Sequence, residues 1–148
     1  MTLILRIGLA VLAVPDVIIG AWNVIAPEHF YENFPGVTLT PPFAEHYARD
    51  FGGTLLGLGV ILCIAVVKPR TVLVVPALIG LAIFALPHAY FHVVHLEGAS
   101  PFETAFTLTA VLGQSVLTVA LLVLAILRWR TSRSTETSAS SEDAPASA

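Results

Sequence analysis

The sequence predicts an all-α fold: a polytopic membrane protein built as a four-transmembrane-helix bundle with both termini in the cytoplasm. Of the 148 residues, 56% are hydrophobic and only 11% are charged, whereas a typical soluble domain has about 25% charged residues. The composition therefore excludes a water-soluble globular enzyme. A nucleic-acid-binding protein is excluded too, because the formal net charge is −3 and the sequence offers no basic face.

Four long apolar runs define the expected helices of one transmembrane domain, residues 1–130. Each run approaches the roughly 20 residues that a helix needs to cross a bilayer. Helix is favoured over strand because an open strand in lipid leaves its backbone groups unpaired. The first run contains Asp16, and we interpret it as a retained helix rather than a cleaved signal peptide. The helices are expected at residues 3–26, 43–67, 71–96 and 104–128.

Lysine and arginine residues are distributed unevenly between the two ends of these helices. The outer side has only Arg49. The inner side collects Arg6, Lys68, Arg70, Arg128, Arg130 and Arg133. The positive-inside rule then places both termini in the cytoplasm of a multi-pass protein of the cell membrane. Residues 131–148 are rich in Ser, Thr and Ala and have no large apolar residue, so we expect a disordered cytoplasmic tail there.

The first outer loop is unusually aromatic and rich in turn residues. Pro35-Gly36 has the order typical of a type II turn. Thr40 followed by Pro41 predicts an N-cap and a first-turn proline, so the second helix should begin near Pro41. Aromatic residues such as Phe30 and Phe34 either anchor the loop at the membrane surface or form a lid over a pocket.

Several polar residues fall at similar membrane depth. Asp16 is costly inside lipid and normally faces a partner or water, and Gln114 and His88 reach a comparable level on their own helices. Arg49 begins higher, but its long side chain can reach down to Asp16. The expected ligand-binding residues are therefore Asp16, Arg49, His88 and Gln114. Two alternative roles are consistent with this layer of polar residues: structural hydrogen bonding, and the handling of a ligand or of protons.

Histidines recur on one face of the third helix. At 100° per residue, His88, His92 and His95 lie within a narrow sector. Imidazole binds zinc, copper and iron, and a second helix could complete a coordination shell. The candidate metal ligands are His46, Asp50, His88, His92 and His95. Polar packing among these residues and acid–base or proton-relay chemistry are the alternatives.

The second helix carries a cluster of glycines. Gly53 and Gly57 form a GxxxG pattern, and Gly52 and Gly59 add further small positions. Small residues allow membrane helices to approach closely. The cluster predicts close packing within the bundle, with formation of a homodimer as the alternative.

The order of these features resembles the DoxX-like family of small four-helix membrane proteins. The resemblance covers roughly residues 5–127 and is carried by FYENFPG, EHYARDFGGTLLGLG, the basic turn KPR and PHAYFHVVH. It implies the four-helix fold, and it implies an association with quinone-linked or other membrane redox assemblies.

Three functions are consistent with these features. The first is an accessory or binding subunit with a polar His/Asp/Arg pocket in the outer half of the bundle. The second is a membrane oxidoreductase component that binds a metal ion, haem or quinone there. The third is a binder or transporter of a small apolar molecule. The expected partners are the lipid bilayer and a second copy or a membrane redox partner, and whether the protein is an enzyme stays open.

Overall fold

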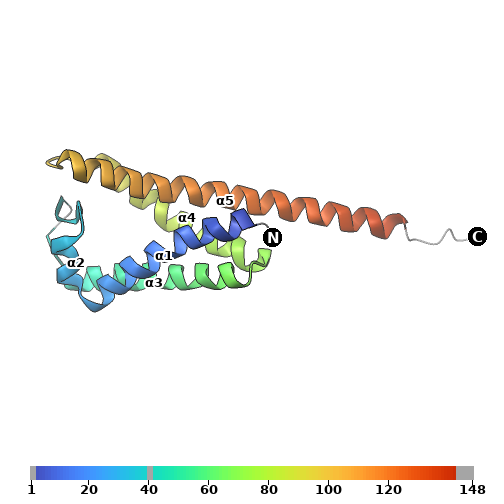
Figure 1. Ribbon diagram of the computed structural model, residues 1–148, viewed down its shortest axis with the longest axis horizontal. Coiled ribbons are helices and arrows are strands. Elements are labelled where there is room, and N and C mark those ends of the chain that lie inside the picture. Colours follow the sequence, from blue (N-terminus) through green and yellow to red (C-terminus); the bar gives the residue numbers. More distant parts are fainter. Residues whose placement is uncertain (1–2, 40–41, 143–148) are drawn as a thin grey trace, which may run out of the picture.

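The computed structural model describes residues 3–39 and 42–142, with side chains described as far as Thr131. Four of its helices are long and apolar enough to cross a membrane, which confirms the prediction of an all-α, four-helix multi-pass membrane protein (Figure 1). In chain order the elements are α1 (Leu3–Ile25), α2 (Pro27–Asn33), a 3-10 turn η1 (Val37–Leu39), α3 (Glu45–Val67), α4 (Thr71–Val94) and α5 (Pro101–Glu142).

Helix α3 begins later than the sequence suggested. Its first residue is Glu45, preceded by Ala44 in an extended conformation without a side-chain cap. The prediction of a start near Pro41 is therefore wrong, and Thr40 and Pro41 lie outside the described residues. Pro42 follows directly after Pro41, and a residue before proline is disfavoured in the helical region, so the proline pair works against a helix start at this point.

Helix α5 begins earlier, at Pro101, because a capping box starts it. Ser100 Oγ accepts a 3.2 Å hydrogen bond from the backbone N–H of Glu103, and Glu103 Oε2 accepts a 2.9 Å hydrogen bond from the N–H of Ser100. Pro101 occupies the first helical position, where its missing N–H costs nothing. The Ser-x-x-Glu spacing was present in the sequence as a signal for this start.

The far end of α5 extends past its apolar segment. The part suited to the membrane is Pro101–Thr131, and the helix continues to Glu142. The disordered tail was expected over 131–148, and residues 143–148 lie outside the described residues. The structure has residues 131–142 as helix, so disorder stays a prediction for residues 143–148 alone.

Glycines bring α1 and α3 into close contact. A Cβ built on Gly20 would lie 2.5 Å from the backbone N of Leu56, and one on Gly52 would lie 2.5 Å from Asn23 Cβ. Gly59 meets Val17 in the same way, at 2.8 Å. By contrast, Gly53 and Gly57 face open space. The glycines that pack the bundle are thus Gly52 and Gly59 rather than the GxxxG pair.

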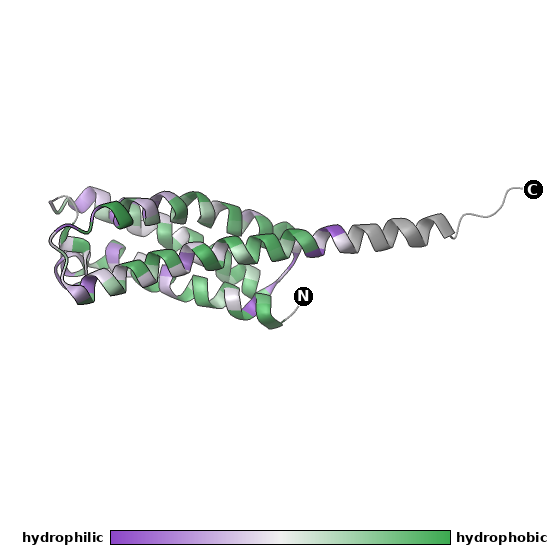
Figure 2. Ribbon diagram, turned by 90° about the horizontal axis from the view of Figure 1, so that it is seen from above, coloured by the Kyte–Doolittle hydropathy of each residue, from purple (hydrophilic) through white to green (hydrophobic). Residues whose placement is uncertain are grey.

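The bundle consists of two helix pairs, α1 with α3 and α4 with α5, each packed more extensively than α3 with α4. The pairs diverge toward the end that carries α2 (Figure 1). We call the end of the bundle that carries α2 the outer end and the opposite end the inner end, after the predicted orientation. The inner half is filled by a core of aliphatic side chains, among them Leu5, Leu9, Leu62, Leu78 and Leu81, each fully buried. Hydrophobic residues dominate the helix bodies, and hydrophilic residues gather at the loops (Figure 2). Packing is therefore tight at the inner end, and room is left at the outer end.

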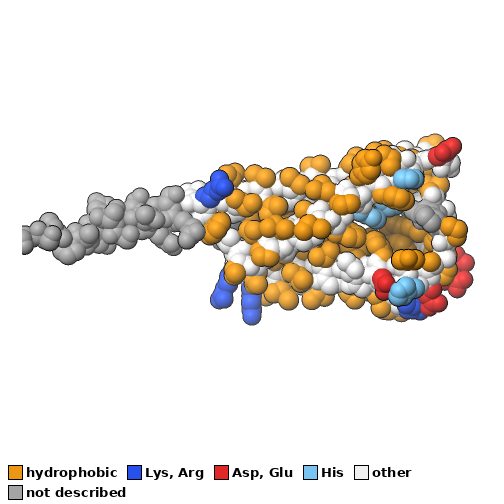
Figure 3. Space-filling model, turned by 180° about the vertical axis from the view of Figure 1, so that it is seen from behind, with side chains coloured by type: hydrophobic (Ala, Val, Ile, Leu, Met, Phe, Trp, Pro, Cys, Tyr) orange, Lys and Arg blue, Asp and Glu red, His pale blue; other side chains and the backbone are white. Residues whose placement is uncertain are grey.

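Charged side chains separate between the two ends. On the face that Figure 3 shows, lysine and arginine side chains lie mainly at the end next to the long α5 extension, and acidic ones lie at the opposite end. This is the asymmetry on which the predicted orientation depends. The cytoplasmic position of the termini and the identity of the membrane stay predictions.

Candidate functional site

A large cavity occupies the outer half of the bundle, where the two helix pairs diverge. Its volume is about 910 Å³, within the range of roughly 300–1,000 Å³ that ligand pockets show. All five helices contribute to its wall, which is mostly apolar. Figure 3 shows the hollow on a lateral face of the bundle, surrounded by hydrophobic side chains and bordered by histidine. Polar groups are few in this wall, so each of them marks a specific position at which a ligand could form a hydrogen bond.

Asp16 and Gln114 form the polar centre of the cavity wall. Gln114 Nε2 donates a 2.7 Å hydrogen bond to Asp16 Oδ1, joining α1 to α5. One turn further along α5, Thr118 donates to the backbone carbonyl of Gln114 at 2.7 Å. The prediction that Asp16 and Gln114 share one layer is confirmed, and both line the cavity together with His88.

The second carboxylate oxygen of Asp16 has no hydrogen-bond partner among the described residues. Only 2% of the residue is exposed, and no described residue forms a hydrogen bond with Oδ2. Buried polar atoms without a partner are rare, because each costs about 1–3 kcal/mol. Asp16 therefore presents an unused hydrogen-bond acceptor at the wall of an apolar cavity.

His88 and His92 lie on the α4 side of the same cavity. Their ring centroids are 4.5 Å apart in an edge-to-face arrangement. His88 also stacks on Phe84 at 5.2 Å and contacts Phe51 of α3 at 5.7 Å. The two histidines thus face the interior of the bundle among aromatic side chains.

The other predicted metal ligands lie elsewhere. His46 Nε2 is 3.3 Å from Asp50 Oδ2, and both side chains are largely exposed on the first turns of α3. His95 follows the last residue of α4 as its C-cap, stacks on Phe91 at 4.1 Å and forms a hydrogen bond with the Phe91 carbonyl. Among the described residues, no three His, Cys, Asp or Glu side chains gather into a group able to hold a metal ion. The five predicted ligands do not form one site, because His46 and Asp50 pair along their own helix while His88 and His92 turn inward.

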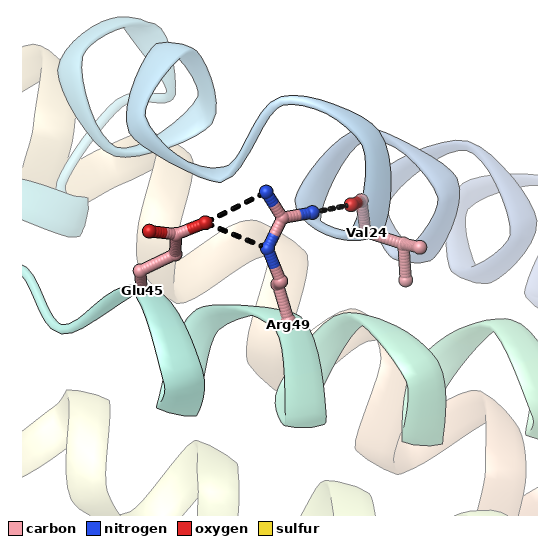
Figure 4. Close-up of polar contacts among 3 residues, drawn as sticks. All are labelled: Val24, Glu45 and Arg49. Atoms are coloured by element: carbon pink, nitrogen blue, oxygen red, sulfur yellow. Dashed lines mark hydrogen bonds and ion pairs between the residues drawn. The ribbon is translucent and has the colours of Figure 1, made fainter.

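Arg49 does not pair with Asp16, contrary to the prediction. Its Nε and Nη2 atoms donate to Glu45 Oε1 at 2.9 and 2.7 Å, and Nη1 donates to the backbone carbonyl of Val24 (Figure 4). Val24 belongs to the last turn of α1, whose carbonyls have no partner within the helix. Asp16 lies about 12 Å further along α1 at a rise of about 1.5 Å per residue. Arg49 therefore fastens the end of α1 to α3 and is not part of the cavity wall.

The aromatic outer loop covers the end of the cavity. The Pro35-Gly36 turn is present as predicted: Gly36 has φ 81°, and the N–H of Val37 bonds to the carbonyl of Phe34 at 3.3 Å. Phe30 is buried and stacks on Phe34 at 4.7 Å, and Phe34 in turn contacts Phe106 of α5 at 5.6 Å. The loop thus has the position of a lid, one of the two alternatives that its composition left open.

Sequence reasoning missed the aromatic residues that line the cavity from the helices. Phe84 and His88 are one helical turn apart and stack, so their spacing was a usable signal. Phe51 belongs to the glycine-rich part of α3, and nothing local indicated that it would contact α4. Thr107 of α5 also lines the cavity, and it lies against Gly36 of the loop.

The chain matches one protein family, described as a domain of unknown function (DUF4345), over residues 4–111. It belongs to the DUF4345 family. The match spans α1 to α4 and the outer part of α5, so it includes Asp16, His88 and His92, and Gln114 follows just after it. No curated protein and no solved structure gave a match. The resemblance to the DoxX-like family stays a prediction.

Proposed function

We propose that this DUF4345 protein binds a small, largely apolar molecule that donates a hydrogen bond to Asp16. The single observation that carries the proposal is the unpartnered Asp16 Oδ2, buried at the wall of a cavity of about 910 Å³. Ligand sites combine apolar walls with a few placed polar groups that orient the ligand. A hydroxyl or amine group at Oδ2 would complete the hydrogen bonding of the carboxylate, while apolar surface on the ligand would contact the aromatic wall.

Gln114 supports this role by positioning the carboxylate. Its 2.7 Å hydrogen bond occupies Oδ1, which leaves Oδ2 as the oxygen available to a ligand. A buried acceptor discriminates strongly between ligands that do and do not donate, because a ligand without a donor leaves the acceptor unpaired. The expected specificity is therefore for molecules of suitable size that carry a donor.

The other functions stay predictions. An accessory role in a redox assembly needs a partner, and a quinone is an apolar ligand that accepts hydrogen bonds in its oxidised form. A donor-bearing apolar ligand matches the acceptor at Asp16 more directly. Gly53 and Gly57 are exposed, and a Cβ at either position would meet nothing within 4 Å in the described chain, which leaves the homodimer as a hypothesis as well.

Two ring compounds of equal size test the proposal: cyclododecanol, which donates a hydrogen bond, and cyclododecanone, which only accepts. Thermal unfolding of the purified protein in detergent is measured with each. A ligand that binds the folded state raises the unfolding temperature, so the alcohol should raise it more than the ketone. Asp16→Asn, which places an N–H group at the acceptor position, should remove this preference.

Glu32→Gln is the matched control, because it removes an exposed carboxylate of α2 that does not line the cavity. This variant should behave like the parent protein. Equal shifts with the alcohol and the ketone in the parent, or an unchanged preference in Asp16→Asn, would refute the proposed function.

A further inference from the structure

We infer that the bound molecule is a single-chain membrane alcohol or amine whose polar end lies at Asp16 and whose hydrocarbon chain leaves the cavity between α3 and α4 into the lipid. The inference rests on the proposed function and adds the ligand class and the route of access. It follows from three features of the cavity: what covers its outer end, what borders its lateral opening, and how deep its polar centre lies.

The outer end of the cavity is covered by α2 and the turn that follows it. The stacked rings of Phe30 and Phe34 lie over the cavity, and Phe106 continues this contact onto α5. Gly36 fits closely against α5, since a Cβ at this position would lie 2.7 Å from Thr107 Oγ1. A ligand arriving from the aqueous side would have to displace this packed aromatic cover.

One lateral side, between α3 and α4, is open. These helices pack less extensively than α1 with α3 or α4 with α5, and Figure 3 shows the hollow on a lateral face. Ring contacts join α3 to α4 at Phe51, which touches Phe84 at 5.8 Å and His88 at 5.7 Å. Outward of Phe51, Tyr47 and Phe91 line the cavity and are 76% and 37% exposed. The opening is therefore bordered by aromatic side chains within about one turn of the outer ends of α3 and α4.

The depth of Asp16 limits the size and charge of the ligand's polar end. Asp16 lies about 14 Å below the outer end of α1 at a rise of about 1.5 Å per residue, well within a hydrocarbon core of about 30 Å. A bulky or multiply charged headgroup would be costly at this depth. A hydroxyl or amine group is small enough, and its one essential contact, with Asp16 Oδ2, is available. A single hydrocarbon chain then fits an apolar cavity that opens on a lateral face of the bundle.

Photolabelling in vesicles tests this inference. The parent protein is reconstituted in phosphatidylcholine vesicles with hexadecanol that carries a mid-chain diazirine and a terminal alkyne, and labelled peptides are identified by mass spectrometry. We expect labels on α3 and α4 around Tyr47 and Phe91. A probe of the same length without the hydroxyl should label these peptides several-fold less, and the corresponding hexadecylamine probe shows whether an amine serves as well.

Two variants separate specific binding from general contact with lipid. Asp16→Leu should reduce labelling by hexadecanol several-fold, to the level of the hydrocarbon probe. Ala48→Trp, which places a large side chain in the cavity wall on α3, should reduce it without altering Asp16. Ala105→Trp is the matched control, because Ala105 is exposed and does not line the cavity.

Labelling that is equal with and without the hydroxyl, or unchanged in both Asp16→Leu and Ala48→Trp, would overturn the inference. Labels confined to α2 and the outer part of α5 would also overturn it, since the chain would then leave through the outer end. Each of these results is compatible with an alcohol preference in the cyclododecanol experiment. The inference can therefore fail while the proposed function stands.

Discussion

Gln114 Nε2 donates a 2.7 Å hydrogen bond to Asp16 Oδ1 across a separation of 98 residues in the chain. This bond joins the first and last membrane-spanning helices inside the wall of the cavity. It fixes the carboxylate in one orientation, and its second oxygen has no partner in the described part of the chain. The same bond therefore contributes both to the stability of the bundle and to the definition of the candidate site.

The first prediction is that Asp16 and Gln114 are energetically coupled. Gln114→Leu should lower the free energy of unfolding by about 1–3 kcal/mol, because it leaves a second buried oxygen of Asp16 unpaired. The measurement is reversible unfolding in mixed micelles. The double variant with Asp16→Leu should lose less stability than the sum of the single variants, since neither partner is then left alone.

Arg49 supplies the control for this double-mutant cycle of Asp16 and Gln114. It bonds to Glu45 and to the carbonyl of Val24 rather than to Asp16. The effects of Arg49→Leu and Asp16→Leu should therefore add, within the roughly 0.5 kcal/mol typical of independent sites. A coupling of Asp16 to Arg49 that matches its coupling to Gln114 would contradict the arrangement described here.

The second prediction uses two neighbouring glycines of α3 that face different surroundings. Gly52→Ala should destabilise the protein by about 1–3 kcal/mol, as overpacking of a close helix contact does. A Cβ at Gly52 would lie 2.5 Å from Asn23 Cβ, whereas nothing lies within 4 Å of the same position at Gly53. Gly53→Ala should be neutral or should stabilise by up to about 1 kcal/mol, because alanine favours helix.

Thermal unfolding of the two glycine variants, prepared and measured side by side, checks this pair. The helix propensity effect is the same at both positions, so the difference between them reports the packing of α1 on α3. The arrangement would be wrong if Gly53→Ala were the more damaging change. A loss of stability with Gly53→Ala that depends on protein concentration would instead point to the homodimer.

The third prediction concerns orientation in the membrane. In a Cys63→Ala background, cysteines introduced at Glu32 and Ser100 should react with an impermeant maleimide added to intact cells, and one at Lys68 should react only after the membrane is opened. All three positions are exposed. The expectation follows from the concentration of lysine and arginine at one end of the bundle. Labelling at Lys68 in intact cells would reverse the assignment.

Much of the fold was predictable because its signals are local. The length and composition of each apolar run determine a membrane helix, since the backbone must satisfy its own hydrogen bonds in lipid. Depth is also local, because each residue adds about 1.5 Å along a helix. That is why Asp16 and Gln114 could be assigned to one layer, and why the Pro35-Gly36 turn could be recognised.

What the sequence by itself determined about this protein is thus the four helices, their order and the depth of their polar residues. Only the tertiary structure decided which of those residues meet. It directed Arg49 to the end of α1, paired His46 with Asp50 on their own helix, and turned Gly52 rather than Gly53 toward α1. The cavity also exists only in the tertiary structure, because it forms where the two helix pairs diverge. The physical reason is that the rotation of each helix and its choice of neighbour depend on the summed packing of many side chains, which no local pattern records.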